Sequence, residues 1–297
     1  MEIGLVLPQT GPDATREHLA AFASTAEQSG YASLWVSDHV VYPREFTSRY
    51  PYAASGRLPD RFQSDSHLLE PLTLLAFVAA ITERVQIGTA VMVLPMRNPV
   101  LHAKVIASLD VLAGGRFVFG VGVGWCREEF EVLSASFERR GARVDEQLAL
   151  MRALWSGEEV THHGEFYDVD GWICRPTPAR PIPLWIGGAR PPALRRAGRL
   201  GDAWIAGAHR LPTFPEDIAT VRQAAEDASR DPDALTFGMV NLPSLAPGRQ
   251  EETATMLREA GERGVQHVRL GVEASADQSA ELIGGFARAY LDDLREV

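Results

Sequence analysis

Several features that mark particular classes of protein are scarce or missing in this chain. Only two of its 297 residues are cysteines, Cys126 and Cys174, and no metal-ligand spacing involves them. There is no basic run, and the formal net charge of -10 disfavours nucleic acids and anionic membranes as partners. The longest apolar run, Pro71 to Ile81, is too short to span a bilayer. We therefore expect no bound metal, no nucleic acid and no membrane.

The first residues lack the basic segment that opens a signal peptide, and they read as a strand from Glu2 to Leu7. With so few cysteines, we expect a reducing, cytoplasmic compartment. The turn that follows, Pro8 to Pro12, lacks the glycine fingerprint of dinucleotide-binding folds. Gly122 and Gly124 have no third glycine and no acidic residue at the usual distance, so they are a weak signal of that kind.

What the chain has throughout is an alternation of strand and helix. Its central unit begins with a β-branched strand from Val85, continues in a helix between Asn98 and Gly114, and ends in an apolar strand from Phe117 to Val123. Strands without polar alternation are typical of a parallel sheet that is buried on both faces. The other expected strands are residues 2–7, 33–36, 183–186, 202–206, 235–240 and 266–270.

The number and order of these elements, eight strands that alternate with eight helices, are those of a closed (β/α)8 TIM barrel. We therefore predict an α/β fold with one domain over residues 1–297. An open doubly wound sheet is the alternative, and the missing fingerprint disfavours it. Two stretches interrupt the alternation, residues 40–68 and residues 157–182, for which the pattern predicts a hairpin. We expect both to be insertions over the carboxyl face of the barrel that close over its ligand.

Catalysis in such barrels takes place at the carboxyl ends of the strands. The residues expected there are Gln9, Asp38, His39, residues 89–91, residues 122–127, residues 187–190, His209 and Gly271. Among them, Asp38 and His39 are the best candidates for chemistry. A histidine can give or take a proton near neutral pH, and an adjacent carboxylate can orient or charge it. The alternative is a pair that only caps the loop after its strand.

Two further features at these strand ends suggest a bound cofactor. Gly187 and Gly188 precede a helix that opens with Pro191, so free backbone N–H groups and the helix dipole favour an anion such as phosphate. An ordinary strand-to-helix turn would also use glycine. Trp125, which follows Gly124, is suited either to line a pocket for a flat ring or to pack under the next helix.

The remaining histidines and cysteines carry less information. His162 and His163 are neighbours on one strand, so their side chains point to opposite faces, and we interpret both as surface residues. Cys126 has no assured cationic neighbour and is interpreted as unreactive. Histidines that lie within expected elements are interpreted as structural, namely His18, His102 and His267.

Several stretches together resemble the bacterial luciferase-like flavin monooxygenase superfamily, and most closely its branch of luciferase-like coenzyme F420-dependent oxidoreductases. The similar stretches are SLWVSDHV at 33–40, TERVQIGTAVMVLPMRNPVLHAKVIASLDVLAGGRFVFGVGVGW at 82–125, FERRGARVDEQLALMRALW at 137–155, HGEFYD at 163–168 and PLWIGGARPPALRRAGRLGDAW at 183–204. They cover most of residues 1–210 and are specific as a set. The last third of the chain shares with the family only the alternation of strands and helices.

The resemblance implies a (β/α)8 barrel that holds a flavin or deazaflavin at its carboxyl face. It implies a non-proline cis peptide at Ala90-Val91, in a bulge that supports the ring, and a catalytic role for His39 with Asp38 before it. The cofactor-binding residues that we expect are Thr89, Ala90, Val91, Gly122, Gly124, Trp125, Gly187, Gly188 and Ala189. Members that oxidise glucose 6-phosphate carry glutamate where this chain has Trp125, which weakens the case for a sugar-phosphate substrate.

From these features we predict an oxidoreductase that transfers hydride between coenzyme F420, a deazaflavin, and a small organic substrate. An FMN-dependent, oxygen-using monooxygenase is the alternative, and a non-catalytic flavin-binding barrel is a second one. FMN ends in one phosphate, whereas the deazaflavin continues from a phosphodiester into lactate and several glutamates. The arginines that could screen this anionic tail, or simply face solvent, are Arg190, Arg195, Arg196 and Arg199. A homodimer is considered as the assembly.

Overall fold

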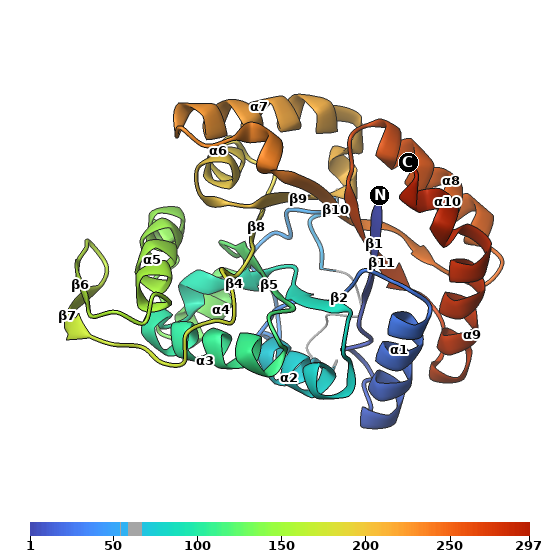
Figure 1. Ribbon diagram of the computed structural model, residues 1–297, viewed down its shortest axis with the longest axis horizontal. Helices are drawn as coiled ribbons and strands as arrows, with labels where there is room; N and C mark the ends of the chain where they lie inside the picture. The colour runs from blue at the N-terminus through green and yellow to red at the C-terminus, as the bar shows by residue number, and fades with distance from the viewer. Residues whose placement is uncertain (54, 59–66) are drawn as a thin grey trace.

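The computed structural model describes residues 1–53, 55–58 and 67–297, and its centre is a closed barrel of parallel strands. The ring closes where the third strand position pairs with the fourth. Helices surround the strands in Figure 1, so the (β/α)8 prediction is confirmed. The strands in barrel order are β1 (Glu2–Val6), β2 (Ser33–Val36), β3 (Gln86–Thr89), β5 (Phe117–Gly122), β8 (Leu184–Gly187), β9 (Ala203–Gly207), β10 (Thr236–Leu245) and β11 (His267–Val272).

The helices form the outer layer and bury one face against the barrel (Figure 1). Side chains cap several of them: Thr15 accepts a hydrogen bond from His18 N–H, and Asn98 accepts one from Val100 N–H. The helices are α1 (Arg16–Gln28), α2 (Pro71–Ile81), α3 (Pro99–Leu112), α4 (Arg127–Val132), α5 (Arg140–Leu154), α6 (Pro191–Leu200), α7 (Phe214–Asp227), α8 (Gln250–Glu262), α9 (Ala276–Phe286) and α10 (Asp292–Arg295).

Side chains fill the interior of the barrel. The rings of Trp35 and Trp185 pack with their centroids 5.0 Å apart, and His267 meets both of them edge-on. Glycine makes room for this layer, because a Cβ on Gly88 would lie 2.5 Å from the Trp35 ring. Ser33 Oγ accepts a hydrogen bond from Trp35 Nε1 at 2.6 Å and lies 2.9 Å from His267 Nε2. The interior is therefore a packed core, and ligands are expected at the carboxyl ends of the strands.

The third strand is interrupted at the carboxyl end of the barrel. β3 ends at Thr89, and β4 (Met92–Val93) resumes the pairing with β5 after the Ala90-Val91 peptide, which is cis as predicted. The interruption places the Val91 side chain between two neighbouring strand ends. A Cβ on Gly122 would lie 2.5 Å from Val91 Cγ2, and one on Gly187 would lie 2.7 Å from Val91 Cγ1. Both glycines therefore make room for Val91, which forms part of the floor of the barrel mouth.

The first insertion lies over this mouth, as predicted, in its described part. Phe46 stacks on Trp125, which follows β5, and the ring of Tyr52 lies 6.0 Å from that of His209, which follows β9. Contacts to the ends of two separated strands show that the insertion crosses the carboxyl side. Residues 54 and 59–66 of this stretch lie outside the described residues.

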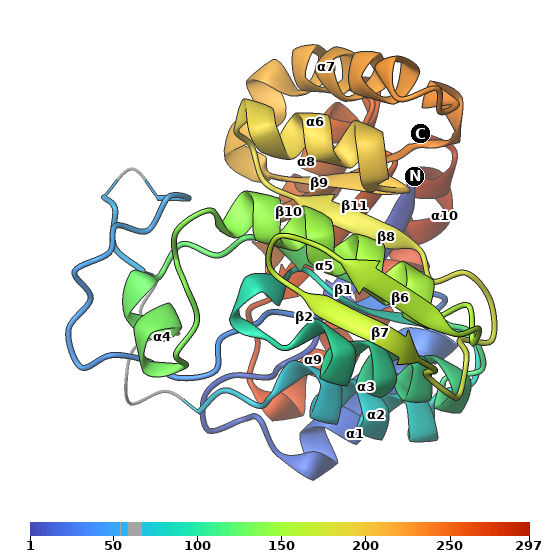
Figure 2. The same cartoon turned by 90° about the vertical axis from the view of Figure 1, so that its left-hand side faces the viewer.

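The prediction that the second insertion closes over the ligand is wrong. β6 (Val160–His163) and β7 (Asp168–Trp172) form an antiparallel hairpin on the outer side of α5 (Figure 2). Glu146 of α5 accepts hydrogen bonds from the backbone N–H groups of Phe166 at 3.0 Å and Tyr167 at 2.7 Å. The reason is topological: α5 ends at the amino side of the barrel, so an excursion between α5 and β8 leaves and returns at that side.

Candidate functional site

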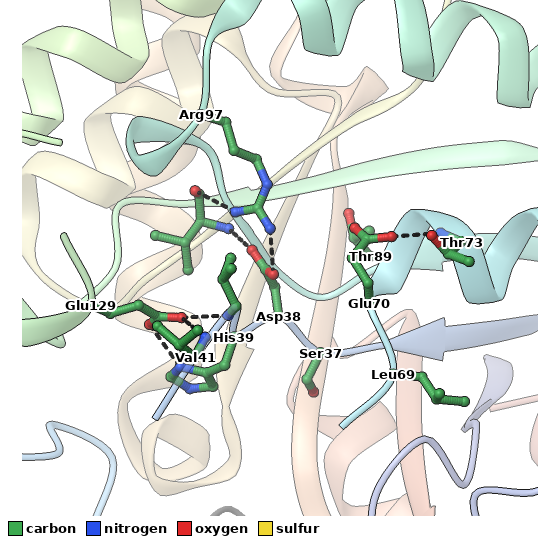
Figure 3. Close-up of polar contacts among 12 residues, drawn as sticks. Ser37, Asp38, His39, Val41, Leu69, Glu70, Thr73, Thr89, Arg97 and Glu129 are labelled. Atoms are coloured by element: carbon green, nitrogen blue, oxygen red, sulfur yellow. Dashed lines mark hydrogen bonds and ion pairs between the residues drawn. The ribbon is translucent and has the colours of Figure 1, made fainter. Parts of the chain in front are cut away.

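A carboxylate from another element holds His39 at the mouth of the barrel. His39 Nδ1 lies 2.9 Å from Oε2 of Glu129, which belongs to α4. Oε1 of the same carboxylate accepts hydrogen bonds from the backbone N–H groups of Val40 at 2.5 Å and Val41 at 3.4 Å (Figure 3). The side chain of Glu129 is 2% exposed and that of His39 is 11% exposed. A positioned imidazole beside a buried carboxylate is suited to proton transfer.

Asp38 does not orient His39, although their adjacency predicts it. One Asp38 oxygen accepts a hydrogen bond from Arg97 Nη2 at 2.7 Å, and the other accepts one from Val93 N–H at 2.7 Å (Figure 3). Both charged side chains are buried, and burial raises the pKa of the Asp38 carboxyl although the Arg97 guanidinium opposes this shift. Asp38 therefore ties the end of β2 to the segment after the bulge.

Glu129 and Arg97 are not among the site residues expected from the sequence. Their partners are 90 and 59 residues away, so no local pattern reveals either pair. A weak signal exists for Glu129: Glu128 and Glu129 open a helix directly after the glycines of the fourth strand position. Acidic residues also favour a helix N-terminus for electrostatic reasons, so this signal alone does not identify a site residue.

Aromatic rings of the first insertion surround Trp125 and His39. Trp125 is half-buried, with Phe46 stacked on it at 5.8 Å between centroids and Tyr50 edge-on at 5.2 Å. The ring of His39 lies 5.9 Å from Trp125 and 5.2 Å from Tyr42. Trp125 thus belongs to a wall of the mouth, the placement expected of a residue that lines a pocket for a flat ring.

Glu128 fixes a second point of the same insertion. One of its carboxylate oxygens accepts hydrogen bonds from Thr47 N–H, from Thr47 Oγ1 at 2.7 Å and from Ser48 N–H at 2.8 Å. Burial favours the neutral carboxyl, but the bonds from Ser48 and Thr47 outweigh it and hold the pKa of Glu128 well below its usual range. We name Glu128 and Glu129 the glutamate clasp, because together they hold residues 40–48 against α4.

Polar contacts brace the bulge in the third strand from within the barrel. Thr89 is buried and its Oγ1 donates a hydrogen bond to the carbonyl of Gly120 at 2.7 Å. The carbonyl of Ala90 accepts one from Arg269 Nη1 at 2.5 Å. Val91 is only partly buried. Thr89 therefore supports the bulge from inside the barrel, and Val91 is the residue of the bulge that contributes surface to the mouth.

The turn after β8 has the form of an anion site. Gly188 has a φ of 126°, and a Cβ on it would lie 2.8 Å from Ala193 Cβ, so the turn requires glycine. Trp204 Nε1 fixes the turn by donating to the Gly188 carbonyl at 2.8 Å. α6 then begins with Pro191 and has no side-chain cap. Gly188 N–H donates to the carbonyl of Ile205 at 3.4 Å, and the first two residues of α6 are prolines, which have no N–H. A phosphate at this turn would therefore be bound by the backbone N–H groups of Ala189 and Arg190.

The arginines of α6 are not arranged as the sequence suggested. Arg196 and Arg199 both pair with Asp145 of α5, the latter at 2.8 Å, so they join two helices and are not available for a cofactor tail. A different arginine lies beside the mouth. Arg140 Nε donates to the carbonyl of Gly124 at 3.1 Å, directly after β5.

A cavity of about 390 Å³ lies at the carboxyl ends of β1, β10 and β11, and α1 and α9 complete its lining with Phe22 and Ser279. Gln9 and Gly271, two of the expected strand-end residues, line it together with Ser37, Ser244 and Arg269. Gln9 is nearly fully buried, and its side-chain amide donates to the carbonyl of Ser37 at 2.9 Å. Polar side chains and apolar ones such as Leu7 share the lining, and the cavity has room for a small organic molecule.

The residues interpreted as unreactive or structural lie in matching surroundings. Burial raises the pKa of the Cys126 thiol to about 12, so it stays protonated near neutral pH. His18 is buried between the Asp13 carbonyl and Ser279 Oγ. His162 lies 3.3 Å from Glu146, on the hairpin outside the barrel. Within residues 1–53, 55–58 and 67–297, no group of three or more potential ligands is placed to hold a metal ion.

Comparison with known proteins shows the family of the chain. The model of the luciferase-like monooxygenase family matches residues 1–289, and the chain belongs to this family. It is therefore an enzyme of the oxidoreductase kind. An uncharacterised protein of Mycobacterium tuberculosis is 36% identical over 208 residues, which are 70% of this chain and 71% of that protein. An F420-dependent glucose-6-phosphate dehydrogenase of Gordonia bronchialis is 34% identical over 73% of this chain and 61% of that protein.

Solved structures share the fold. An F420-dependent secondary alcohol dehydrogenase in complex with an F420-acetone adduct superposes with a TM-score of 0.78 at 20% identity, over 96% of this chain and 97% of that one. Monooxygenase RslO1 from Streptomyces bottropensis also gives 0.78 at 20% identity, over 99% of each chain. Among the described helices, none is long and apolar enough to cross a bilayer.

Proposed function

We propose that this enzyme uses coenzyme F420, a deazaflavin, to transfer hydride to or from a small alcohol or carbonyl compound. The observation that supports it is that two sets of residues with different chemistry lie at the mouth of the barrel. One set offers a flat support at Val91 and an anion site in the turn after β8. The other offers His39, held by Glu129. The name of the Gordonia bronchialis relative supports the same cofactor.

Each residue would have a distinct role in such a reaction. When bound, the deazaflavin supplies the carbon that accepts or donates hydride. The backbone N–H groups of the turn after β8 would bind the phosphate, and Val91 would support one face of the ring. His39 would move the substrate proton at Nε2, because Glu129 occupies Nδ1. The aromatic rings around Trp125 would exclude water from the reacting atoms.

The choice of deazaflavin over FMN rests on charge beside the anion site. Arg127 and Arg140 place their guanidinium groups 4.3 and 3.9 Å from the centre of the Phe137 ring. Burial lowers the pKa of Arg140, the carboxylate of Glu138 opposes this shift, and the positive charges of Arg127 and Arg190 add to it. Arg127 pairs with Glu138 at 2.7 Å, so the basic rim that would suit a tail of several carboxylates consists of Arg140 and Arg190, in a chain of net charge -10.

A titration of the apo protein tests the cofactor. Wild type is titrated across a salt series with coenzyme F420, with the same deazaflavin lacking phosphate and tail, and with FMN. We expect F420 to bind most tightly, with an affinity that falls as salt rises, and Arg140→Met to weaken it about tenfold. Arg199→Met is the matched control, because Arg199 pairs with Asp145. Tight FMN binding without deazaflavin binding would overturn the proposal and favour the oxygen-using monooxygenase.

A second arm tests catalysis itself. Reduced and oxidised F420 are incubated with a panel of small alcohols, aldehydes and ketones, and the absorbance of the deazaflavin is followed. Turnover of at least one compound is expected, because Glu129 holds His39 at the mouth, where its imidazole can move the substrate proton. Cofactor binding without turnover of any compound would favour the non-catalytic flavin-binding barrel.

We also propose a homodimer that covers the outer side of α3. This helix leaves large apolar side chains in solvent, with Leu101 at 59% and Leu112 at 73% exposure and Val111 at 44%. A second copy of the same helix would remove them from water, at about 25 cal/mol per Å² of apolar surface. Sedimentation of wild type and of Leu101→Glu tests this, and a wild type that stays monomeric at all concentrations would contradict it.

A further inference from the structure

Both oxygens of Glu129 are occupied, and by different kinds of donor. Oε2 faces the ring nitrogen Nδ1 of His39 at 2.9 Å, whereas Oε1 accepts the backbone N–H of Val40 at 2.5 Å (Figure 3). An ionised carboxylate has no proton to donate, so Nδ1 has to carry the proton of this hydrogen bond. In the neutral ring the lone pair then lies on Nε2.

We infer that Glu129 is a positioning residue that selects the tautomer of His39 and ties this histidine to the root of the first insertion. One rigid group performs both tasks, because Val40 directly follows His39 and the same carboxylate binds both. Movement of residues 40 and 41 away from α4 would also release the imidazole. The proton-transfer role of His39 rests on the proposed function, whereas the choice of tautomer does not.

No other described carboxylate near His39 can replace Glu129 in this role. The oxygens of Asp38 are used by Arg97 and by Val93 N–H. Glu128 lies on the same helix but accepts from Thr47 and Ser48. The aromatic side chains of Tyr42, at 5.2 Å, and Trp125, at 5.9 Å, also contact the ring and carry no carboxylate.

Glu129→Gln is a sharp test because the amide has only one acceptor oxygen. If this oxygen keeps the strong bond to Val40 N–H, the NH2 group faces His39 Nδ1. A donor at that place requires Nδ1 to accept, so the proton moves to Nε2. The variant therefore keeps the shape of the site and reverses the tautomer.

The matched control is Glu128→Gln on the other half of the glutamate clasp. It removes a charge from the same helix and weakens the hold on residues 47 and 48, but it leaves the His39 contact in place. A change seen in Glu129→Gln and absent in Glu128→Gln therefore reports the contact to the imidazole. A change shared by both variants reports the loop alone.

The direct measurement is ¹⁵N NMR of histidine-labelled apo protein at alkaline pH, with His39 assigned by the His39→Gln spectrum. Wild type and Glu128→Gln should show protonated Nδ1, and Glu129→Gln should show protonated Nε2. Protonated Nε2 in wild type, or an unchanged tautomer in a folded Glu129→Gln, would overturn the inference. The wild-type spectrum decides the first point even if the variant fails to fold.

Kinetics then separate this inference from the proposed function. With F420 and an active substrate, Glu129→Gln should lower kcat by about 10²–10⁴-fold at unchanged cofactor affinity, since the wrong nitrogen faces the substrate. If no deazaflavin binds, the proposed function fails while the NMR result stands. If F420 turns over equally in wild type and in Glu129→Gln, the proposed function stands and the positioning role fails.

Discussion

Two histidines in this barrel lie in contrasting surroundings, one in the packed interior and one at the mouth. His267 is buried against Trp35 and Trp185, and its polar partner is the neutral hydroxyl of Ser33. Burial lowers its pKa to about 3, so it stays uncharged near neutral pH. His39 instead meets the charged carboxylate of Glu129. A hydroxyl only satisfies the ring nitrogen, whereas a carboxylate can stabilise the charged ring that proton transfer produces.

Carboxylates mark the same difference between the two regions. The interior layer around Trp35 contains hydroxyl and imidazole groups and the guanidinium of Arg269, and its size is set by glycines such as Gly88. The mouth contains two buried carboxylates, Asp38 and Glu129, each held by donors from a distant segment. Buried charges destabilise a fold unless they are paired, and a buried carboxylate that faces a histidine at a strand end is typical of a functional site.

The largest expected effects are those of replacing each of the two histidines by alanine, and they should differ in kind. His39→Ala should lower kcat by about 10²–10⁴-fold with little change in cofactor affinity, because its role is proton transfer. His267→Ala should instead lower the free energy of unfolding by about 2–4 kcal/mol, through a cavity and an unpaired Ser33 hydroxyl. Turnover at saturating F420 and denaturant unfolding distinguish them. Equal losses of kcat in both folded variants would break the contrast.

Removal of a buried charge at the mouth should have the next largest effect. Asp38→Ala leaves the Arg97 guanidinium, 7% exposed, without its partner, so unfolding should become about 3–5 kcal/mol easier. The matched control is Asp233→Ala, whose partner Arg222 is 42% exposed and whose own side chain is 77% exposed. Because water screens that pair, its loss should cost about 1 kcal/mol or less. Similar costs for both variants in urea unfolding would contradict the assignment of Asp38.

A smaller and pH-dependent effect is expected at the glutamate clasp. The pKa of Glu128 is lowered in the folded state from an ordinary value of 4.5, so its hydrogen bonds stabilise the fold above that value. This stabilisation should be lost as the pH falls through the lowered pKa. The difference in unfolding free energy between wild type and Glu128→Gln should therefore be largest near neutral pH and shrink in acid. A difference that does not vary with pH would contradict this.

The strands and helices are readable from the sequence because their signals are local. The apolar run of β5, the cap at Asn98 and the glycine stop after α3 each depend on neighbouring residues, and the structure shows all three. The cis peptide at Ala90-Val91 was expected from family resemblance and not from periodicity. The site was predicted less completely: His39 lies at the mouth, but Asp38 is not its partner.

The two corrections have different physical origins. Residues 157–182 connect a helix to the next strand, and in a (β/α)8 barrel such a connection lies at the amino side, so the order of elements already determines their position. Glu129, in contrast, reaches His39 across 90 residues because α4 turns one side toward the end of β2. By itself, the sequence determined the alternation of elements and the strand ends at which polar residues gather, since periodicity and capping act over a few residues. Only the tertiary structure decided which carboxylate meets the imidazole, because that contact depends on the relative placement of elements that are distant in the chain.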